Sequence, residues 1–281
     1  MQEEYGMRVP QGSIVIKPMG EHEWTFEYPR LTWKVMDEFY EALEFWRAGY
    51  YADAEDSYRE LIRDYPEFID VHHHLALVLS VTDREDEAFE MWSELVQMVL
   101  RLLPDEFEMG RDRLPWFILE NRPFLRAYHG LGLEYLDRGH IPQALDVFNN
   151  ILAMNPGDNQ GVRALVIDCC FRLRDSRGVM AVCDQFPEDL MEHVLYGRAL
   201  ALHQMGREDE AKASLREAIE CFPLVGKELV KARHRKPKNL REDTVTLGGA
   251  DQAYFYWLDQ GGHWKRTPGA LDLVRDCLGM T

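Results

Sequence analysis

Small, aromatic and proline residues recur along the chain at a fixed spacing. In three segments, a glycine is followed by a small residue five positions later, a large residue nine later and a proline seventeen later. The residues in this register are Gly49, Ala54, Tyr58 and Pro66; Gly139, Ala144, Phe148 and Pro156; and Gly206, Ala211, Leu215 and Pro223. Three occurrences of one register indicate a repeated structural unit.

The offsets predict a pair of antiparallel helices in each unit. A small residue lies seven positions before each glycine, and a large one lies four before. Small side chains allow two helices to approach closely, and the large one fills the space beside the contact. The glycine ends the first helix, and the proline ends the second. Each unit is therefore expected to be a helix–turn–helix.

Two further units are degenerate, and an insertion separates the groups. Asp83 lies one period after Gly49 and is followed by Ala88 and Trp92 in the same register. The interval from Asp83 to Gly139 exceeds one period, whereas Gly139 and Gly206 are two periods apart. We predict a β-hairpin extension in 1–31, repeats one and two in 32–103, an insertion in 104–121, repeats three to five in 122–224, and a basic linker with a helical cap in 225–281.

The period and the recurring register resemble the tetratricopeptide repeat, whose unit is a helix–turn–helix of about 34 residues. This resemblance implies an all-α, right-handed helical solenoid of about five repeats. Alternating residues around Pro18 and Gly20 predict a small N-terminal β-hairpin. The last repeat of a solenoid needs a cover for its apolar face, so we expect the C-terminal tail to form a helical cap.

The tail also resembles the C-terminal part of the suppressor of tumorigenicity family and of bacterial tetratricopeptide proteins with a similar tail. In that family a repeat that ends in proline is followed by a Gly/Asp–Ala–Tyr stretch and then by W-K-R-x-x-G-A-L. The matching residues are Gly249, Asp251, Ala253, Tyr254, Trp264, Lys265, Arg266, Gly269, Ala270 and Leu271. The resemblance covers the tail alone and implies no reaction.

Charge and composition narrow the classes of partner. Residues 1–120 hold 27 acidic and 11 basic side chains, a balance of −16 within a total of −17. Such a surface repels duplex nucleic acid, and no apolar run is long enough for a membrane span. Five cysteines without a C-x-x-C motif favour a cytoplasmic location. The basic stretch 227–241 either docks an acidic partner or lies against acidic surface of its own chain or of a second copy.

The motifs of common enzyme active sites and nucleotide sites are missing, so we expect no enzyme, no catalytic residue and no cofactor. Three consecutive histidines, His72 to His74, suggest a metal site, because histidine is a common metal ligand. On a helix, however, successive side chains point about 100° apart, so the three cannot converge on one ion. The repeat register assigns His72 to packing and His73 to the groove, leaves His74 undetermined, and predicts no metal site.

The predicted function is a non-enzymatic protein-interaction module or scaffold. Positions ten and thirteen residues before each turn are expected to face the concave groove, where such repeats bind peptides. The groove residues are His73, Arg126, His129, Asn159, Gln160, Arg163, His193 and Tyr196. This basic and polar strip suits a protein or peptide with an acidic or C-terminal carboxylate group. The alternatives are a self-associating homo-oligomeric scaffold and, with less support, an enzyme accessory subunit.

Overall fold

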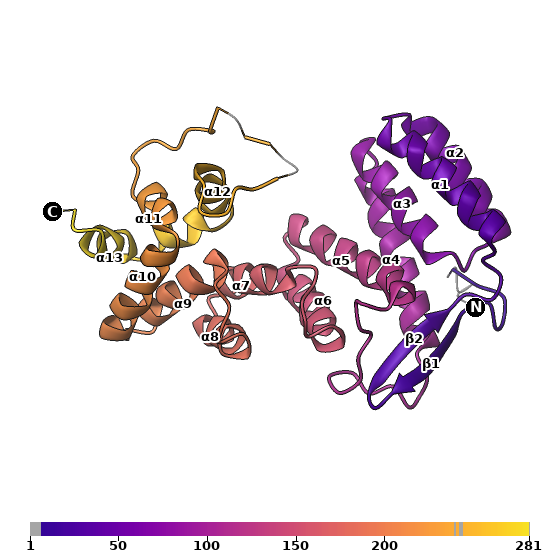
Figure 1. The fold of residues 1–281 in the computed structure, drawn as a ribbon, viewed down its shortest axis with the longest axis horizontal. Helices are drawn as coiled ribbons and strands as arrows, with labels where there is room; N and C mark the ends of the chain where they lie inside the picture. Colours follow the sequence, from indigo (N-terminus) through magenta and orange to yellow (C-terminus); the bar gives the residue numbers. More distant parts are fainter. Residues whose placement is uncertain (1–6, 239, 242–243, 281) are drawn as a thin grey trace, which may run out of the picture. The chain divides into compact units, whose positions relative to one another are not determined.

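The computed structural model describes residues 7–238, 240–241 and 244–280, and these form thirteen α-helices, a short 3-10 helix and a two-stranded sheet (Figure 1). None of these helices has the length and apolar character needed to cross a bilayer. The elements are β1 (Val15–Gly20), β2 (Glu23–Glu27), α1 (Trp33–Arg47), α2 (Tyr51–Asp64), α3 (Ile69–Val81), α4 (Glu85–Leu102), η1 (Leu119–Asn121), α5 (Arg122–Asp137), α6 (Ile141–Met154), α7 (Val162–Arg172), α8 (Ser176–Gln185), α9 (Glu192–Gln204), α10 (Glu208–Cys221), α11 (Pro223–Leu229), α12 (Ala250–Arg266) and α13 (Ala270–Cys277).

The chain divides into two compact units, which are described separately below. Unit 1 comprises Met1–Val162, and unit 2 comprises Arg163–Thr281. The boundary falls inside the segment 122–224 that the repeat spacing assigns to repeats three to five. The division into the five predicted segments stays a prediction.

The predicted helix pairs are confirmed, and their turns share one backbone geometry. Gly49, Gly139 and Gly206 have φ values of 80°, 74° and 74°, in the left-handed region that glycine adopts without strain. Asp83 stands at the equivalent place with a φ of 58°. At each turn, the amide of the next residue donates to the carbonyl four residues before the turn residue, as in Arg84 N to Leu79 O at 3.0 Å.

The turn of the fourth repeat lies one residue later than the spacing predicts. A groove position at Arg163 implies a turn residue at 173, but the left-handed residue is Arg174, with a φ of 59°. The amide of Asp175 donates to Cys170 O at 2.8 Å, which matches the bond of the other turns. Ala164, not Arg163, therefore occupies the tenth position before this turn. The repeats are not all of equal length, so counting by a fixed period shifted the register.

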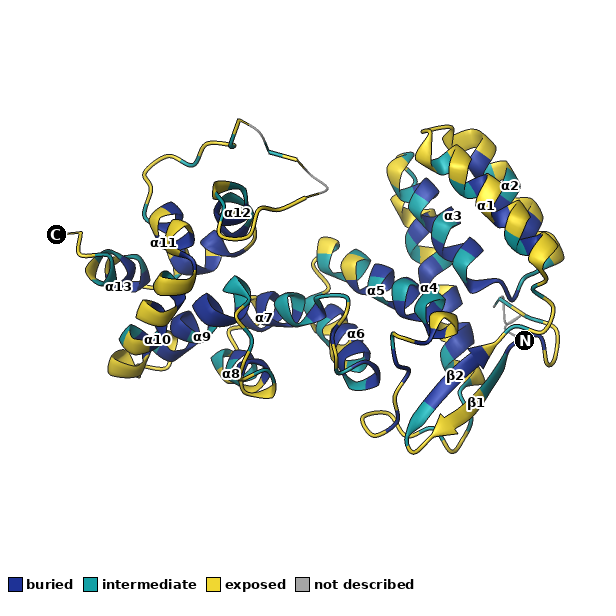
Figure 2. Cartoon of the chain, in the orientation of Figure 1, coloured by how far each residue is buried: buried dark blue, intermediate teal, exposed yellow. Residues whose placement is uncertain are grey.

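The positions that define the repeat form the core (Figure 2). The alanines five residues after the turns are fully buried, as are Tyr58 and Phe148 at the ninth position. The small residue seven before the turn is Gly132 in the third repeat, and an added Cβ there would lie 2.4 Å from a ring carbon of Phe148. Close packing between α5 and α6 therefore requires glycine at this position.

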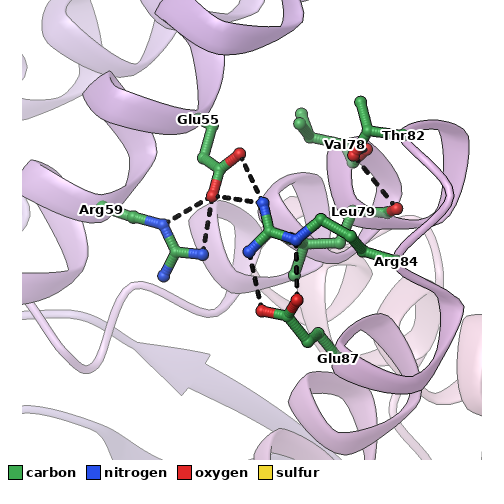
Figure 3. A network of polar contacts seen from close by, with 7 residues as sticks. All are labelled: Glu55, Arg59, Val78, Leu79, Thr82, Arg84 and Glu87. Carbon is green, nitrogen blue, oxygen red and sulfur yellow. Dashed lines mark hydrogen bonds and ion pairs between the residues drawn. The ribbon is translucent and has the colours of Figure 1, made fainter.

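A shared arginine joins the first two repeats (Figure 3). Arg84, at the start of α4, donates through Nη1 to both carboxylate oxygens of Glu55 on α2 at 2.9 Å. It also bonds Glu87 at 2.7 Å, while Arg59 bonds Glu55 at 2.8 Å. The fork geometry of a guanidinium suits this bridging of two carboxylates.

The predicted N-terminal hairpin is confirmed and packs on the third repeat of unit 1. β1 and β2 pair antiparallel, with Ile16 opposite Phe26, and the ring of Phe26 lies 5.7 Å from that of Phe124 on α5. Asn121, which is fully buried, fixes the hairpin to the insertion. Its Oδ1 accepts from Phe26 N at 3.2 Å, and its Nδ2 donates to the carbonyls of Trp24 and Pro115 at 3.0 and 3.2 Å.

The predicted helical cap at the C-terminus is also confirmed. Helix α12 packs on α9 and α11, and α13 packs on α10. In the basic stretch 227–241, His234 packs against the rest of its own chain. Its ring stacks on that of Trp257 of α12 at 3.5 Å, and its Nδ1 bonds the buried carboxylate of Glu228 at 2.9 Å. Most other basic side chains of 227–241 are exposed, so the stretch lies against its own chain in part.

Candidate functional site

The predicted groove residues are divided between the two units. Unit 1 contains His73, Arg126, His129, Asn159 and Gln160, and unit 2 contains Arg163, His193 and Tyr196. Helices α3 and α5 pack on each other in unit 1 and bring three of these residues together. Two neighbours on α3 complete the α3–α5 cluster, which consists of Asp70, His73, His74, Arg126 and His129.

An internal ion pair lies at the centre of the α3–α5 cluster. Nη2 of Arg126 donates to both carboxylate oxygens of Asp70 at 2.7 Å each. The side chain of Asp70 is mostly buried, while 34% of the Arg126 side chain is exposed. His74 Nδ1 donates to the carbonyl oxygen of Asp70 at 2.8 Å, and Trp92 Nε1 donates to His73 Nδ1 at 3.0 Å. The cluster thus has an accessible guanidinium beside a fixed carboxylate.

The histidines of the cluster contribute polarity, not charge. Burial lowers the pKa of His73 well below 6.5, and the adjacent His74, Arg126 and His129 lower it further. Burial also lowers the pKa of His74 and of His129. A cation is poorly solvated in a low-dielectric interior, so these imidazoles are neutral at pH 7. Within the cluster, Arg126 alone supplies the positive charge that the sequence analysis assigned to the strip.

Several polar atoms around this cluster have no hydrogen-bond partner among the described residues. They are Arg126 Nε, His129 Nε2 and Gln160 Oε1, and all three are buried. Gln160 is held by its Nε2, which donates to Leu125 O at 3.1 Å. A buried polar group without a partner costs about 1–3 kcal/mol, so a ligand or water that supplies the missing bonds is favoured at this place.

Asn159 is placed apart from this set. It is exposed and lines a cavity of about 450 Å³ that also involves the insertion residues Arg113 and Trp116. Its predicted role in a groove stays a prediction.

The predicted residues of unit 2 are occupied by contacts within their own chain. Arg163 forms an ion pair with Asp189 and lies over the ring of Phe186 at 5.2 Å. Tyr196 is fully buried, and its hydroxyl donates to Phe222 O at 2.8 Å. A fully buried side chain offers no surface to a partner, so the expected groove exposure of Tyr196 is corrected.

Helix α12 is the reason for this burial. The ring of Tyr256 on α12 lies 5.4 Å from that of Tyr196 and 5.3 Å from that of His193. Burial alone would lower the pKa of His193, but its ion pairs with Asp259 at 3.8 Å and Glu192 at 3.4 Å outweigh burial and raise that pKa to about 9. His193 is therefore a cation at pH 7, and its charge is matched by carboxylates of its own unit.

A second polar network links α7 to α12 in unit 2. His263 Nε2 donates to Asp168 Oδ1 at 2.6 Å, and Arg172 Nε donates to Asp168 Oδ2 at 2.7 Å. Nη2 of Arg266 donates to His263 Nδ1 at 2.9 Å. The network borders an open cavity of about 1000 Å³. Both ring nitrogens of His263 are engaged, so this histidine–aspartate pair serves to hold α12 and has no nitrogen left to act as a general base.

The three consecutive histidines point to different surroundings. His72 is buried, its Nε2 donates to Pro66 O at 2.8 Å, and burial lowers its pKa to about 4. His73 contacts Trp92, and His74 contacts Asp70, as described above. Within the described ranges, no group of three histidine, cysteine or acidic residues is arranged to hold a metal ion.

The W-K-R-x-x-G-A-L stretch forms the junction between the last two helices. Trp264 is fully buried, and its Nε1 donates to the hydroxyl of Tyr256 at 3.0 Å. Lys265 lies over the ring of Trp257 at 4.3 Å. Gly269 has a φ of 76° and precedes a fully buried alanine at the start of α13. Structural requirements of the cap thus account for the pattern.

Asp70, the partner of Arg126, and Asn121, which fixes the hairpin, are not among the residues predicted from the sequence. Asp70 pairs with a residue on another repeat, and Asn121 bonds a strand far away in the sequence. Asn121 belongs to no local motif. Asp70 has a signal in the repeat register, because it lies thirteen residues before Asp83, as Arg126 does before Gly139.

Comparison with solved structures supports the repeat fold. A tetratricopeptide repeat protein from Parabacteroides merdae aligns with a TM-score of 0.53 and 13% identity, over 88% of this chain and 80% of that chain. YrrB, described as a tetratricopeptide protein with an unusual peptide-binding site, also aligns, with a TM-score of 0.45 and 14% identity, over 79% of this chain and 92% of that chain. No curated protein matches the sequence.

The family comparison covers most of both units. The profile of the family described as Transcriptional repressor TCF25 matches residues 24–252, from β2 to the first turn of α12. This range includes the second hairpin strand, the insertion and all five helix pairs. The chain has the tetratricopeptide fold and belongs to the TCF25 family of transcriptional repressors.

Proposed function

We propose that the protein is a non-enzymatic interaction module that binds a peptide or protein segment at the α3–α5 cluster of unit 1. The family is described as a transcriptional repressor, a role that proteins carry out by binding other molecules. Helical repeat solenoids form extended surfaces that bind partners. Of the predicted groove residues, His73, Arg126, His129 and Gln160 are the ones that we assign to this site.

The observation that carries the proposal is the partly exposed Arg126–Asp70 pair. A partly buried ion pair adds little to stability, because desolvation offsets the attraction between the charges. Arg126 uses Nη2 in the pair and its Nε is buried, so its Nη1 remains for a ligand. The neutral histidines beside it supply hydrogen bonds without adding charge. This arrangement suits a peptide carbonyl or a carboxylate, including a C-terminal one.

The proposal is tested by capture of partners from native lysate with wild type and the variant Arg126→Met. Methionine keeps much of the length of the side chain and removes its donors. Arg138→Met is the matched control, since Arg138 follows α5 directly and pairs with carboxylates, Asp86 and Glu134. We expect Arg126→Met to reduce capture at least tenfold and the control to reduce it less than twofold. Equal capture by all three proteins contradicts the proposal.

A homo-oligomeric scaffold is the second candidate function, and one observation favours it. Trp33 and Tyr40, seven residues apart on one face of α1, are 85% and 51% exposed. Exposed aromatic residues that share a helix face are typical of contact surfaces. Light scattering over a concentration series tests this candidate. A monomer at every concentration excludes it and leaves the α3–α5 cluster as the interaction site.

A cytoplasmic location remains part of the proposal. It rests on the cysteine pattern of the sequence, five cysteines without a C-x-x-C motif. Fractionation of cells that express the full chain tests this point. Recovery in the nuclear fraction alone contradicts it.

A further inference from the structure

A second candidate site in unit 1 is the cavity of about 450 Å³ beside the insertion. Its size lies within the range of about 300–1,000 Å³ that is usual for ligand sites. Four segments form it: the β-hairpin, the insertion, the first residue of α5, and the end of α6 with the loop that follows. The lining residues that matter here are Glu23, Arg113, Trp116, Phe117, Arg122 and Asn155.

Backbone hydrogen bonds fix the walls of this cavity. Arg113 N donates to His22 O at 2.8 Å, and Trp24 N donates to Arg113 O at 2.9 Å. Leu114 N donates to Met154 O at 2.8 Å, which ties the insertion to the end of α6. The bonds of Asn121 described above hold the insertion to β2. The cavity is therefore shaped by structure that does not depend on a ligand.

The cavity gathers hydrogen-bond donors that are not used within the protein. Arg122 donates its Nε to Trp116 O at 2.8 Å and lies over the Trp116 ring at 5.2 Å, which leaves its two Nη groups available. Arg113 is exposed, and its guanidinium has no polar partner in the described part of the chain. Asn155 is only 4% exposed, and its Nδ2 has no hydrogen-bond partner among the described residues.

Charge and apolar surface narrow the chemistry of the occupant. The lining holds two guanidinium groups and one carboxylate, that of Glu23, so it is net positive within the acidic half of the chain. Phe117 is 70% exposed, although a phenylalanine is costly to leave in water. Guanidinium pairs select carboxylates, and an exposed aromatic ring beside them selects an apolar neighbour. A long polyanion such as nucleic acid would be repelled by the remaining acidic surface.

We infer that this cavity binds an acidic peptide segment of a partner protein, one that presents an aspartate or glutamate next to a large apolar side chain. The carboxylate bonds Arg113 and Arg122, and the apolar side chain packs on Phe117 and Trp116. This site uses none of the residues of the α3–α5 cluster, so it extends the proposed function to a second contact.

The test is binding of the full chain to an array of short peptides. Each peptide carries one Asp or Glu beside Phe, Trp or Leu, and each has a partner peptide with the isosteric Asn or Gln. We expect a subset of acidic peptides to bind at least tenfold more tightly than their amide partners, which corresponds to about 1.4 kcal/mol. If no acidic peptide shows such a preference, the inference is overturned.

A matched pair of variants locates the binding site. Arg113→Gln removes a guanidinium that makes no hydrogen bond or ion pair with the described residues, and Arg111→Gln removes an exposed one from the same insertion, where Arg111 bonds Glu108 at 2.9 Å. For the best acidic peptide we expect Arg113→Gln to weaken binding about tenfold and Arg111→Gln to weaken it less than twofold. Both variants should melt at the wild-type temperature. Equal binding by the two variants contradicts the site.

Two further arms separate this inference from its alternatives. Arg126→Met should leave the peptide affinity unchanged, so failure of the α3–α5 proposal and failure of this one are distinguishable. Inorganic phosphate at millimolar concentration should displace the peptide only weakly, because it lacks the apolar contact. Complete displacement by phosphate, or unchanged affinity in Phe117→Ser, would show a general anion site and overturn the assignment to a peptide.

Discussion

Replacement of Asn121 by alanine tests whether one buried amide holds the hairpin and the insertion to the third repeat. The change removes three hydrogen bonds and leaves the buried amide of Phe26 and the carbonyls of Trp24 and Pro115 without this partner. Each lost bond costs about 0.5–1.5 kcal/mol, and more where the remaining group stays buried. Summed over the three bonds, we expect a loss of about 3 kcal/mol in the free energy of unfolding.

The assay is urea unfolding followed by circular dichroism, combined with hydrogen exchange. Exchange should accelerate in residues 22–27 and 113–118 of unit 1, while α9 and α10 of unit 2 keep their protection. Asn150→Ala is the control, because Asn150 is only partly buried and donates one bond, to the Tyr128 hydroxyl at 3.0 Å. The control should lose about 1 kcal/mol.

Asn121→Asp sharpens the test. Aspartate keeps the acceptor for Phe26 N but replaces the Nδ2 donor by an oxygen that faces two carbonyls. At pH 7 this variant should be less stable than Asn121→Ala, because a buried carboxylate beside carbonyl oxygens is unfavourable. An alanine variant that loses no more stability than the Asn150→Ala control, or a more stable aspartate variant, would refute the reasoning.

Three further predictions concern packing and pH. Gly132→Ala should lower stability by about 1–3 kcal/mol, since its Cβ would lie 2.4 Å from the Phe148 ring. The control is Gly157→Ala, where the atom nearest to the added Cβ is 3.4 Å away. Equal melting temperatures of the two variants contradict the packing argument. The pKa of His72 is lowered to about 4, so the unfolded chain binds the extra proton, and stability should fall by about 3 kcal/mol as the pH drops from 6.5 towards 4. In His72→Gln the loss of stability between pH 6.5 and pH 4 should be smaller than in wild type. An equal change of the urea midpoint with pH in the two proteins contradicts the assignment to His72. The pKa of His193 is raised to about 9, so its contribution is complete below pH 6.5 and lost as the pH rises through 9; His193→Gln should flatten the alkaline side of the stability profile, and an unaltered profile counts against the ion pairs.

The repeat architecture was predictable because its signal is distributed over many positions. Asp83 was identified as a turn residue although it is not glycine, since Ala88 and Trp92 kept the register, and its φ of 58° confirms it. The turn at Arg174 was misplaced by one residue, because the repeat around it has lost its glycine and its alanine together. A turn residue can therefore be predicted from the sequence only where other positions of the same repeat keep their characteristic residues.

The site was less predictable because it depends on contacts between distant segments. The register correctly assigned His72 to packing. Tyr196 occupies an equivalent groove position, but α12 lies over it, and that helix begins far beyond Tyr196 in the chain. Asp70 lies thirteen residues before the turn residue Asp83, the position that Arg126 occupies before Gly139, so the repeat register places both side chains on the groove face. The register does not show that the two side chains pair with each other, because that contact depends on the packing of α3 against α5.

Site-specific photocrosslinking tests the central claim most directly. A benzoylphenylalanine is placed in the full chain at Leu133, an exposed residue of α5 four positions after His129, or at Glu60, an exposed residue of α2. After irradiation in cells, the account predicts a protein adduct from position 133 that is lost in the Arg126→Met background, and none from position 60. Adducts from position 60 alone, or an adduct at position 133 that persists without Arg126, would contradict it.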